Sequence, residues 1–165
     1  MSGGVKLEVV LRVLGFVLSF VAAIVVGLDK QTKVIPALDL VVSAKWHYLS
    51  AFVYLFAVDI ITSSYGLLSL LLTLTNKNQS NTSILLLIVL DTVMVALLSS
   101  GGGAAMAIGM IGYHGNSHVM WNKVCDIFGR FCKHVAVSTV LSLAGAVVFM
   151  SLVVLAVVDL QKRPK

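Results

Sequence analysis

The sequence has little charge. Of its 165 residues only 12% are charged, 59% are hydrophobic, and the mean hydropathy is +1.02. A soluble domain carries about a quarter charged residues. A globule of this size also leaves too many residues near its surface to bury so many apolar side chains. The shortage of charge therefore excludes a water-soluble fold and predicts that much of the chain faces lipid.

Catalytic and ligand-binding motifs are missing as well. No Ser–His–Asp order, phosphate loop or nucleophile elbow occurs in a polar stretch. The net charge of +5 comes without a basic stripe or a nucleic-acid-binding motif. Gly115 and Asn116 interrupt the stretch between His114 and His118, which disfavours a helical pair of metal ligands. We therefore expect no enzyme, no cofactor, no metal site and no nucleic-acid partner.

The chain does have four long apolar runs. Each exceeds the roughly 20 residues that a helix needs to cross the hydrocarbon core. Helices are favoured over strands because lipid offers no partner to an open sheet edge. We predict an all-α integral membrane protein, a four-transmembrane-helix bundle that forms one domain over residues 1–165. The expected helices are at about 9–28, 48–74, 84–111 and 135–158, with loops at about 29–47 and 113–134 and a turn at 75–83.

The distribution of charge leaves the orientation in the membrane open. Four spans put both termini on one side, but Lys and Arg are divided nearly evenly between the two sides. The positive-inside rule therefore does not discriminate. The sequons that begin at Asn78 and Asn81 would place the 75–83 turn outside, but such tripeptides are common by chance and this turn lies very close to the bilayer, so we give them little weight.

Three ionisable residues, Arg12, Asp59 and Asp91, fall within the apolar runs. A charge at the centre of a membrane helix costs about 2.5–3.5 kcal/mol and needs a partner or a purpose. The first and third spans run in the same direction, which places Arg12 and Asp91 in one leaflet, and we predict an interhelical ion pair that fixes helix packing. Asp59 is expected near mid-bilayer beside Thr62 and Ser63. The alternative is a proton or ion relay through all three, which would make the chain a small channel or transporter.

Small residues recur at four-residue spacing in three of the spans. This spacing lines one helix face with small side chains and lets backbones approach closely. We predict packing within the bundle, with a dimer face between protomers as the alternative. The residues are Gly15, Ser19, Ala23 and Gly27 in the first span, Gly101, Ala105 and Gly109 in the third, and Ser138, Ser142 and Ala146 in the fourth.

Cysteine is limited to Cys125 and Cys132, both in the loop expected at 113–134. On a continuous helix their Cα atoms would lie about 10 Å apart, too far for a disulfide, whereas a folded-back loop would let them bond. An extracytoplasmic location would favour the oxidised pair. Their spacing is not that of a redox motif, so we expect no disulfide-exchange activity.

Several stretches match a known pattern, and Arg12 in the first span and Asp91 in the third belong to it. The stretches are Leu28-Asp29-Lys30-Gln31-Thr32-Lys33, Ala44-Lys45-Trp46-His47-Tyr48, Ser50-Ala51-Phe52-Val53-Tyr54, Gly115-Asn116-Ser117-His118, Trp121, Val124-Cys125, Phe128-Gly129 and Phe131-Cys132. Together they resemble the plant CASP-like proteins, relatives of the Casparian strip membrane domain proteins, and fit a group 1-like member. The resemblance covers nearly the whole chain. Asp59 falls where relatives often carry Asn.

The resemblance implies a MARVEL-like four-helix bundle in the plasma membrane with both termini in the cytoplasm. It places Cys125 and Cys132 in the second extracellular loop. It also implies a non-enzymatic scaffold that self-associates and mixes with relatives to organise membrane subdomains. Its partners would be copies of itself, other CASP-like proteins and the lipid bilayer, with cell-wall modifying enzymes as a further class. The motif of the strip-forming members is missing between Asp29 and His47, so their role in wall modification is not carried over.

Overall fold

Four long helices make up most of the structure. The computed structural model describes residues 2–35, 40–75 and 80–162. Within these ranges four helices are long and apolar enough to cross a membrane. They are α1 (Ser2–Gly27), α2 (Ser50–Thr75), α3 (Asn81–His114) and α4 (Gly129–Lys162). The predicted all-α, four-helix membrane fold is confirmed.

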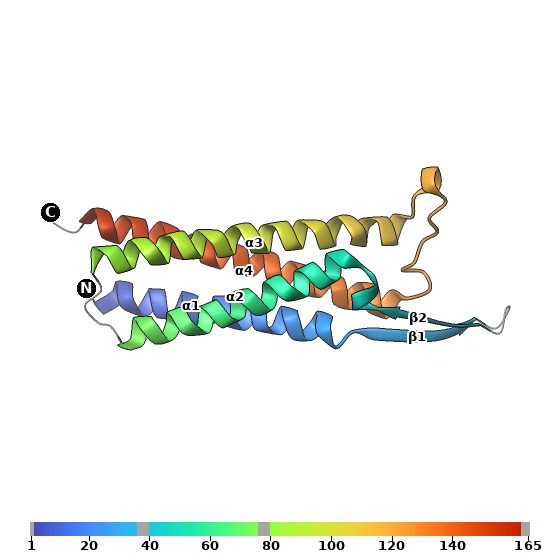
Figure 1. The fold of residues 1–165 in the computed structure, drawn as a ribbon, viewed down its shortest axis with the longest axis horizontal. Helices are drawn as coiled ribbons and strands as arrows, with labels where there is room; N and C mark the ends of the chain where they lie inside the picture. Colours follow the sequence, from blue (N-terminus) through green and yellow to red (C-terminus); the bar gives the residue numbers. More distant parts are fainter. Residues whose placement is uncertain (1, 36–39, 76–79, 163–165) are drawn as a thin grey trace.

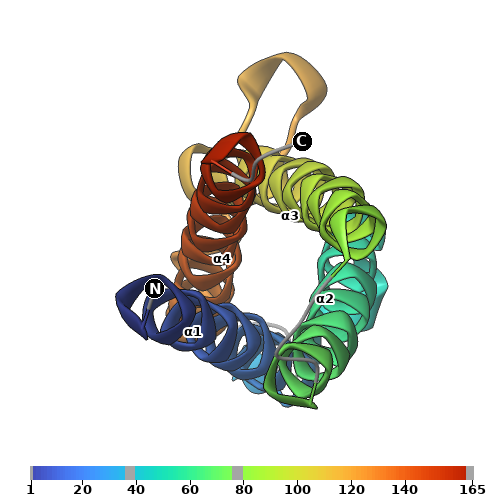
Figure 2. The same ribbon diagram turned by 90° about the vertical axis from the view of Figure 1, so that its left-hand side faces the viewer.

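The helices form a square when the bundle is viewed along its length (Figure 2). Both α1 and α3 pack beside α2 and α4, so α1 and α3 occupy one diagonal and α2 and α4 occupy the other. α1 begins and α4 ends at the same end of the bundle, here called the terminal end (Figure 1). The segment after α1 projects from the opposite end, here called the hairpin end.

The first loop, expected at 29–47, contains a β-hairpin that the sequence analysis did not foresee. Strand β1 (Lys30–Ile35) pairs antiparallel with β2 (Leu40–Lys45), with Thr32 opposite Ser43. Both strands are rich in β-branched residues, a signal that favours strands. The short 3₁₀ helix η1 (Trp46–Tyr48) then leads into α2. Residues 36–39 of this loop, and residues 76–79 of the expected 75–83 turn with the Asn78 sequon, lie outside the described residues.

The helices extend beyond the apolar runs from which they were predicted. α4 begins at Gly129 rather than near residue 135, so Cys132 and His134 lie in a helix and the expectation of a loop up to 134 is wrong there. α1 likewise begins at Ser2. α3 and α4 have 34 residues each, which gives a length of about 51 Å, well above the roughly 30 Å of the hydrocarbon core. The apolar runs mark only the part of each helix that faces hydrocarbon.

Two clusters of buried apolar residues fill the bundle. One cluster, toward the hairpin end, includes Phe52, Leu55 and Phe131. The other includes Leu98 and Phe149. The outer helix faces keep large apolar side chains exposed, for example Leu68 at 61% and Val140 at 62%. A soluble monomer would not expose such extended apolar faces, so these are the surfaces that face lipid.

Most of the predicted small residues face neighbouring helices. A Cβ added to Gly15 would lie 3.1 Å from the ring of Phe149, whereas one added to Gly109 would meet nothing within 4 Å. Gly66 was not among the predicted residues, yet a Cβ there would lie 3.3 Å from the Cα atom of Phe16. The α1 and α2 backbones therefore approach closely at Gly66. Of the predicted set, the buried members are Gly15, Ser19, Ala23, Gly101, Ala105, Ser138, Ser142 and Ala146, and the partly buried members are Gly27 and Gly109.

Candidate functional site

A cluster of charged and polar side chains lies inside the bundle toward the terminal end. We call it the charged centre; it consists of Glu8, Arg12, Tyr65 and Asp91. Arg12 is 1% exposed and Asp91 is fully buried. Arg12 Nη2 lies 3.5 Å from Asp91 Oδ2, and Arg12 Nε donates to Glu8 Oε1 at 3.1 Å. The Tyr65 hydroxyl donates to Asp91 Oδ1 at 2.6 Å.

Two of these four residues, Arg12 and Asp91, are predicted from the sequence. Their common depth predicts that they lie together, and the structure brings them within reach of each other. Glu8 was missed although it stands four residues before Arg12, the spacing at which helical side chains interact. Tyr65 carries no sequence signal, because its contact depends on how α2 is rotated about its own axis.

The charged centre connects α1 and α3, the two helices on one diagonal of the square. α1 and α3 are not neighbours around its perimeter, so the contact between Arg12 and Asp91 crosses the interior of the bundle. A buried charge left without its partner costs about 3–5 kcal/mol. The mutual position of α1 and α3 is therefore tied to this contact.

A second polar cluster connects α2 and α4, the helices on the other diagonal. We call it the acid–serine centre; it consists of Asp59 on α2 with Ser138 and Ser142 on α4, all fully buried. Ser142 Oγ lies 2.9 Å from Asp59 Oδ1 and 2.8 Å from Oδ2. The Ser138 hydroxyl donates to the carbonyl oxygen of Ala22 on α1 at 2.9 Å. The cluster thus joins three of the four helices.

The partner of Asp59 differs from the expected surroundings. The Ser63 hydroxyl donates to the backbone oxygen of Ile60, and the Thr62 hydroxyl faces the sulfur of Met94 at 3.7 Å. The hydroxyls of Thr62 and Ser63 are therefore directed to partners other than Asp59. Ser142 had been assigned only to a small-residue packing face, and nothing in the sequence shows that α4 would bring it across the square to α2.

At the hairpin end, polar contacts and a disulfide fasten the loops to the start of α4. The Phe131 N–H, one of the unpaired donors of the first helical turn, donates to Gln31 Oε1 at 2.9 Å. Asp29 Oδ1 lies 3.0 Å from His134 Nδ1. Burial raises the pKa of the Asp29 carboxyl, and the hydrogen bond to His134 opposes this rise.

Cys125 and Cys132 form a disulfide, with their Cα atoms 5.7 Å apart. The bond is possible because Cys125 lies in the turn before α4 and only Cys132 lies on the helix. Of the two arrangements that the sequence left open, the folded-back one occurs.

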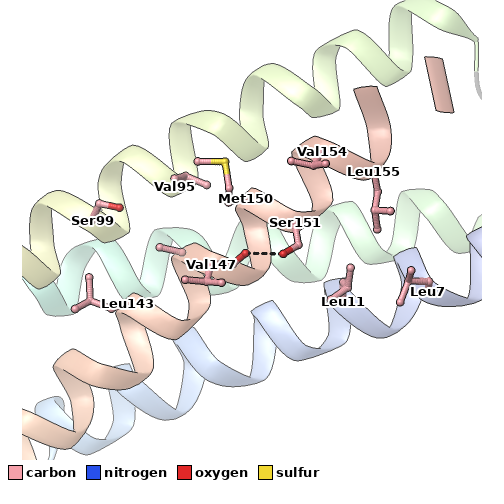
Figure 3. Close-up of a pocket in the computed structure, with 11 residues that line it drawn as sticks. Leu7, Leu11, Val95, Ser99, Leu143, Val147, Met150, Ser151, Val154 and Leu155 are labelled. Carbon is pink, nitrogen blue, oxygen red and sulfur yellow. Dashed lines mark hydrogen bonds between the residues drawn. The ribbon is translucent and has the colours of Figure 1, made fainter. Parts of the chain in front are cut away.

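The outer surface carries an apolar groove of about 690 Å³ along α4 (Figure 3). Leu11 of α1 and Val95 of α3 contribute to its lining, with Val147, Met150 and Ser151 from α4. The Ser151 hydroxyl donates to the backbone oxygen of Val147 at 2.9 Å. The described residues that line this groove are all uncharged. In a bilayer it would be filled by hydrocarbon chains or by an apolar helix.

Comparison with known proteins gives one consistent result. The family described as Casparian strip membrane protein domain matches residues 1–148. The chain is 51% identical to CASP-like protein 1E1 of Populus trichocarpa, over 99% of this chain and 88% of the relative. It is 49% identical to CASP-like protein 1E1 of Glycine max (94% and 87% covered) and 46% identical to that of Arabidopsis thaliana (93% and 86% covered). No solved structure matches.

Proposed function

Since the chain belongs to the Casparian strip membrane protein family, as a multi-pass CASP-like protein of group 1, we propose that it is a non-enzymatic scaffold of the plasma membrane. In this proposal it self-associates, mixes with family relatives and thereby organises membrane subdomains. Other CASP-like proteins are its first class of partner, and cell-wall modifying enzymes are a further class.

The observation that carries the proposal is that Arg12, Asp91 and Asp59 each have a polar partner inside the bundle. Arg12 contacts Asp91 and Glu8, and Asp59 contacts Ser142 on the opposite helix. These contacts tie both diagonals of the square while the outer faces remain apolar. A rigid bundle with a lipid-facing apolar surface suits a structural role, because its outward faces are available to lipid and to other helices.

Co-capture tests the proposal directly. Two copies with different tags are expressed together, extracted in polymer discs that keep native lipid, and captured through one tag. The second tag should be recovered from co-expressed cells and not from a mixture of separately extracted samples. Mass spectrometry of the captured discs should find family relatives. Recovery of neither a second copy nor a relative would refute self-association and mixing.

Two matched variants then identify the contact face. Met150→Trp fills the groove, and Leu71→Trp enlarges an exposed face of α2; the two native side chains are 49% and 50% exposed. If copies associate along α4, only Met150→Trp should reduce co-capture. A loss confined to Leu71→Trp would place the contact on α2 instead.

We further propose that the termini are cytoplasmic and that the hairpin end is extracellular. The Cys125–Cys132 disulfide supports this orientation, because such bonds persist on the oxidising side of the membrane. A membrane-impermeant reductant followed by an impermeant maleimide should label both cysteines on intact cells. Labelling that requires permeabilisation would reverse the orientation.

The runner-up function is a small channel or transporter that uses Arg12, Asp59 and Asp91. Flux through liposomes that contain the purified chain separates it from the scaffold. We expect no specific conductance. A conductance that is present in the wild type and lost in Asp91→Asn would overturn the scaffold proposal.

A further inference from the structure

Asp59 is a fully buried carboxyl for which the described residues offer no cation as a partner. Among the described residues, Arg12 forms ion pairs with Glu8 and Asp91, His134 forms a hydrogen bond with Asp29, and none of these contacts includes Asp59. We propose that Asp59 and Ser142 form a proton-binding site between α2 and α4. In this site Asp59 is a neutral carboxylic acid that donates a hydrogen bond to the Ser142 hydroxyl.

The hydrogen-bond partners of Asp59 favour the neutral acid. Ser142 Oγ lies 2.8 and 2.9 Å from the carboxyl oxygens of Asp59, and 3.0 Å from the carbonyl oxygen of Ser138. A hydroxyl has one hydrogen, so Ser142 can serve either a carboxylate or that carbonyl, but not both. A protonated Asp59 instead donates to Ser142 Oγ, and Ser142 donates onward to Ser138. An ionised Asp59 would instead be a buried charge whose one hydrogen-bond donor among the described residues is this hydroxyl, and buried charges need a cation or several donors.

The charged centre shows how the same fold treats a carboxylate. Asp91 is as deeply buried as Asp59, but it receives the Tyr65 hydroxyl at 2.6 Å and faces Arg12 at 3.5 Å. A hydroxyl-to-oxygen distance of 2.5–2.7 Å is typical of an ionised acceptor. Among the described residues, Asp59 has neither a cation nor a second hydroxyl to offset the cost of burying a charge. Two buried aspartates are thus placed in environments that favour opposite protonation states.

The other titratable groups on the four helices lie at different levels of the bundle. Tyr65 stands six residues after Asp59 on α2, about 9 Å along the axis, and it marks the level of Arg12 on α1 and Asp91 on α3. On α4, His134 precedes Ser142 by eight residues, about 12 Å, and contacts Asp29. In the part of the chain that the structure describes, Asp59 therefore has only a hydroxyl as its hydrogen-bond partner.

Infrared spectroscopy of the full chain in lipid nanodiscs tests the proton directly. At neutral pH we expect the C=O stretch of a protonated carboxylic acid, resolved above the amide I band and shifted downward in D₂O. The band should be missing in Asp59→Asn, whose amide can donate to Ser142 in the same way. It should persist in Asp126→Asn, which removes an exposed carboxyl. A wild-type spectrum without the band, or an unchanged band in Asp59→Asn, would overturn the proposal.

A second variant keeps the test decisive if Asp59→Asn does not fold. Ser142→Ala removes the acceptor of the proposed hydrogen bond, and the same band should move to higher frequency. A band that does not move would show that the proton lies on another group. In an alkaline titration, loss of the band should coincide with a loss of thermal stability in the wild type. Equal alkaline losses in the wild type and in Asp59→Asn would also contradict the assignment.

Discussion

The approach of α1 to α2 at Gly66 can be tested by a matched pair of glycine substitutions. Gly66→Leu pushes a side chain into the backbone of Phe16, because even the first added carbon would lie 3.3 Å from Cα and 3.6 Å from the amide nitrogen. Gly103→Leu makes the same chemical change on α3, where an added Cβ meets nothing within 4 Å. Both substitutions gain the same helix propensity, about 0.8 kcal/mol, so the difference between them isolates the clash.

The expected difference is large. Inserting carbon atoms into a packed interface costs about 1–3 kcal/mol when side chains can move aside. A backbone has less freedom to do so, and we therefore expect Gly66→Leu to be about 3 kcal/mol less stable than Gly103→Leu. This corresponds to about 100-fold in the folding equilibrium.

The assay is the midpoint of unfolding by SDS titration in mixed micelles, followed by circular dichroism on monomeric protein. Gly103→Leu should unfold near the wild-type midpoint, and Gly66→Leu should unfold at a clearly lower SDS fraction. Equal midpoints, or a lower midpoint for Gly103→Leu, would refute the close approach of the two helices.

The hairpin end gives three further predictions. Cys125→Ser opens a disulfide that spans a sequence separation of 7, and we expect a loss of about 2 kcal/mol in the same titration. Gln31→Ala leaves the Phe131 N–H without its side-chain acceptor, at an expected cost of about 1 kcal/mol, with Thr32→Ala as the control. Burial raises the pKa of Asp29, so the folded state favours its protonated form. The protonated Asp29 contributes to stability fully below the ordinary carboxyl pKa of about 4. This contribution is lost as the pH rises through the raised pKa of the folded state. Unfolding midpoints measured across the acidic range should show this fall in the wild type and not in Asp29→Asn.

Each of these predictions has an outcome that contradicts it. Wild-type protein with its disulfide reduced should unfold at the same SDS fraction as Cys125→Ser. If oxidised wild-type protein also unfolded at that fraction, the disulfide would not stabilise the fold. If Thr32→Ala lowered the unfolding midpoint as much as Gln31→Ala did, the loss would reflect a general effect on β1 rather than the missing hydrogen bond to the Phe131 N–H. If Asp29→Asn kept the wild-type pH dependence, another group would be responsible for it.

The membrane fold could be predicted from the sequence because the transfer of apolar segments into lipid depends on their composition and length. Runs of apolar residues longer than the bilayer is thick leave no choice but helices, whichever neighbours they meet. The depth of a residue in the membrane follows from its position along its apolar run, and for this reason the sequence alone could pair Arg12 with Asp91. Glu8 was within reach of sequence reasoning too, since its relation to Arg12 is local.

Contacts that depend on rotation and crossing of helices could not be predicted. Tyr65 reaches Asp91, and Ser142 reaches Asp59, only because of how α2 and α4 turn their faces into the square. Gly66 was overlooked because one small residue without a repeat gives no pattern to recognise. The hairpin was missed because its strands are short and their β-branched residues are equally common in the spans.

The central claim is that charges inside the bundle neutralise each other across the α1–α3 diagonal, and a charge exchange tests it most directly. Glu8 complicates a simple exchange, since an acidic residue at position 12 would face it. The exchange is therefore made in a Glu8→Gln background. Arg12→Asp and Asp91→Arg should each lose about 3–5 kcal/mol of stability, and the combined variant should recover most of that loss in the SDS titration. A combined variant no more stable than the single ones would contradict the account.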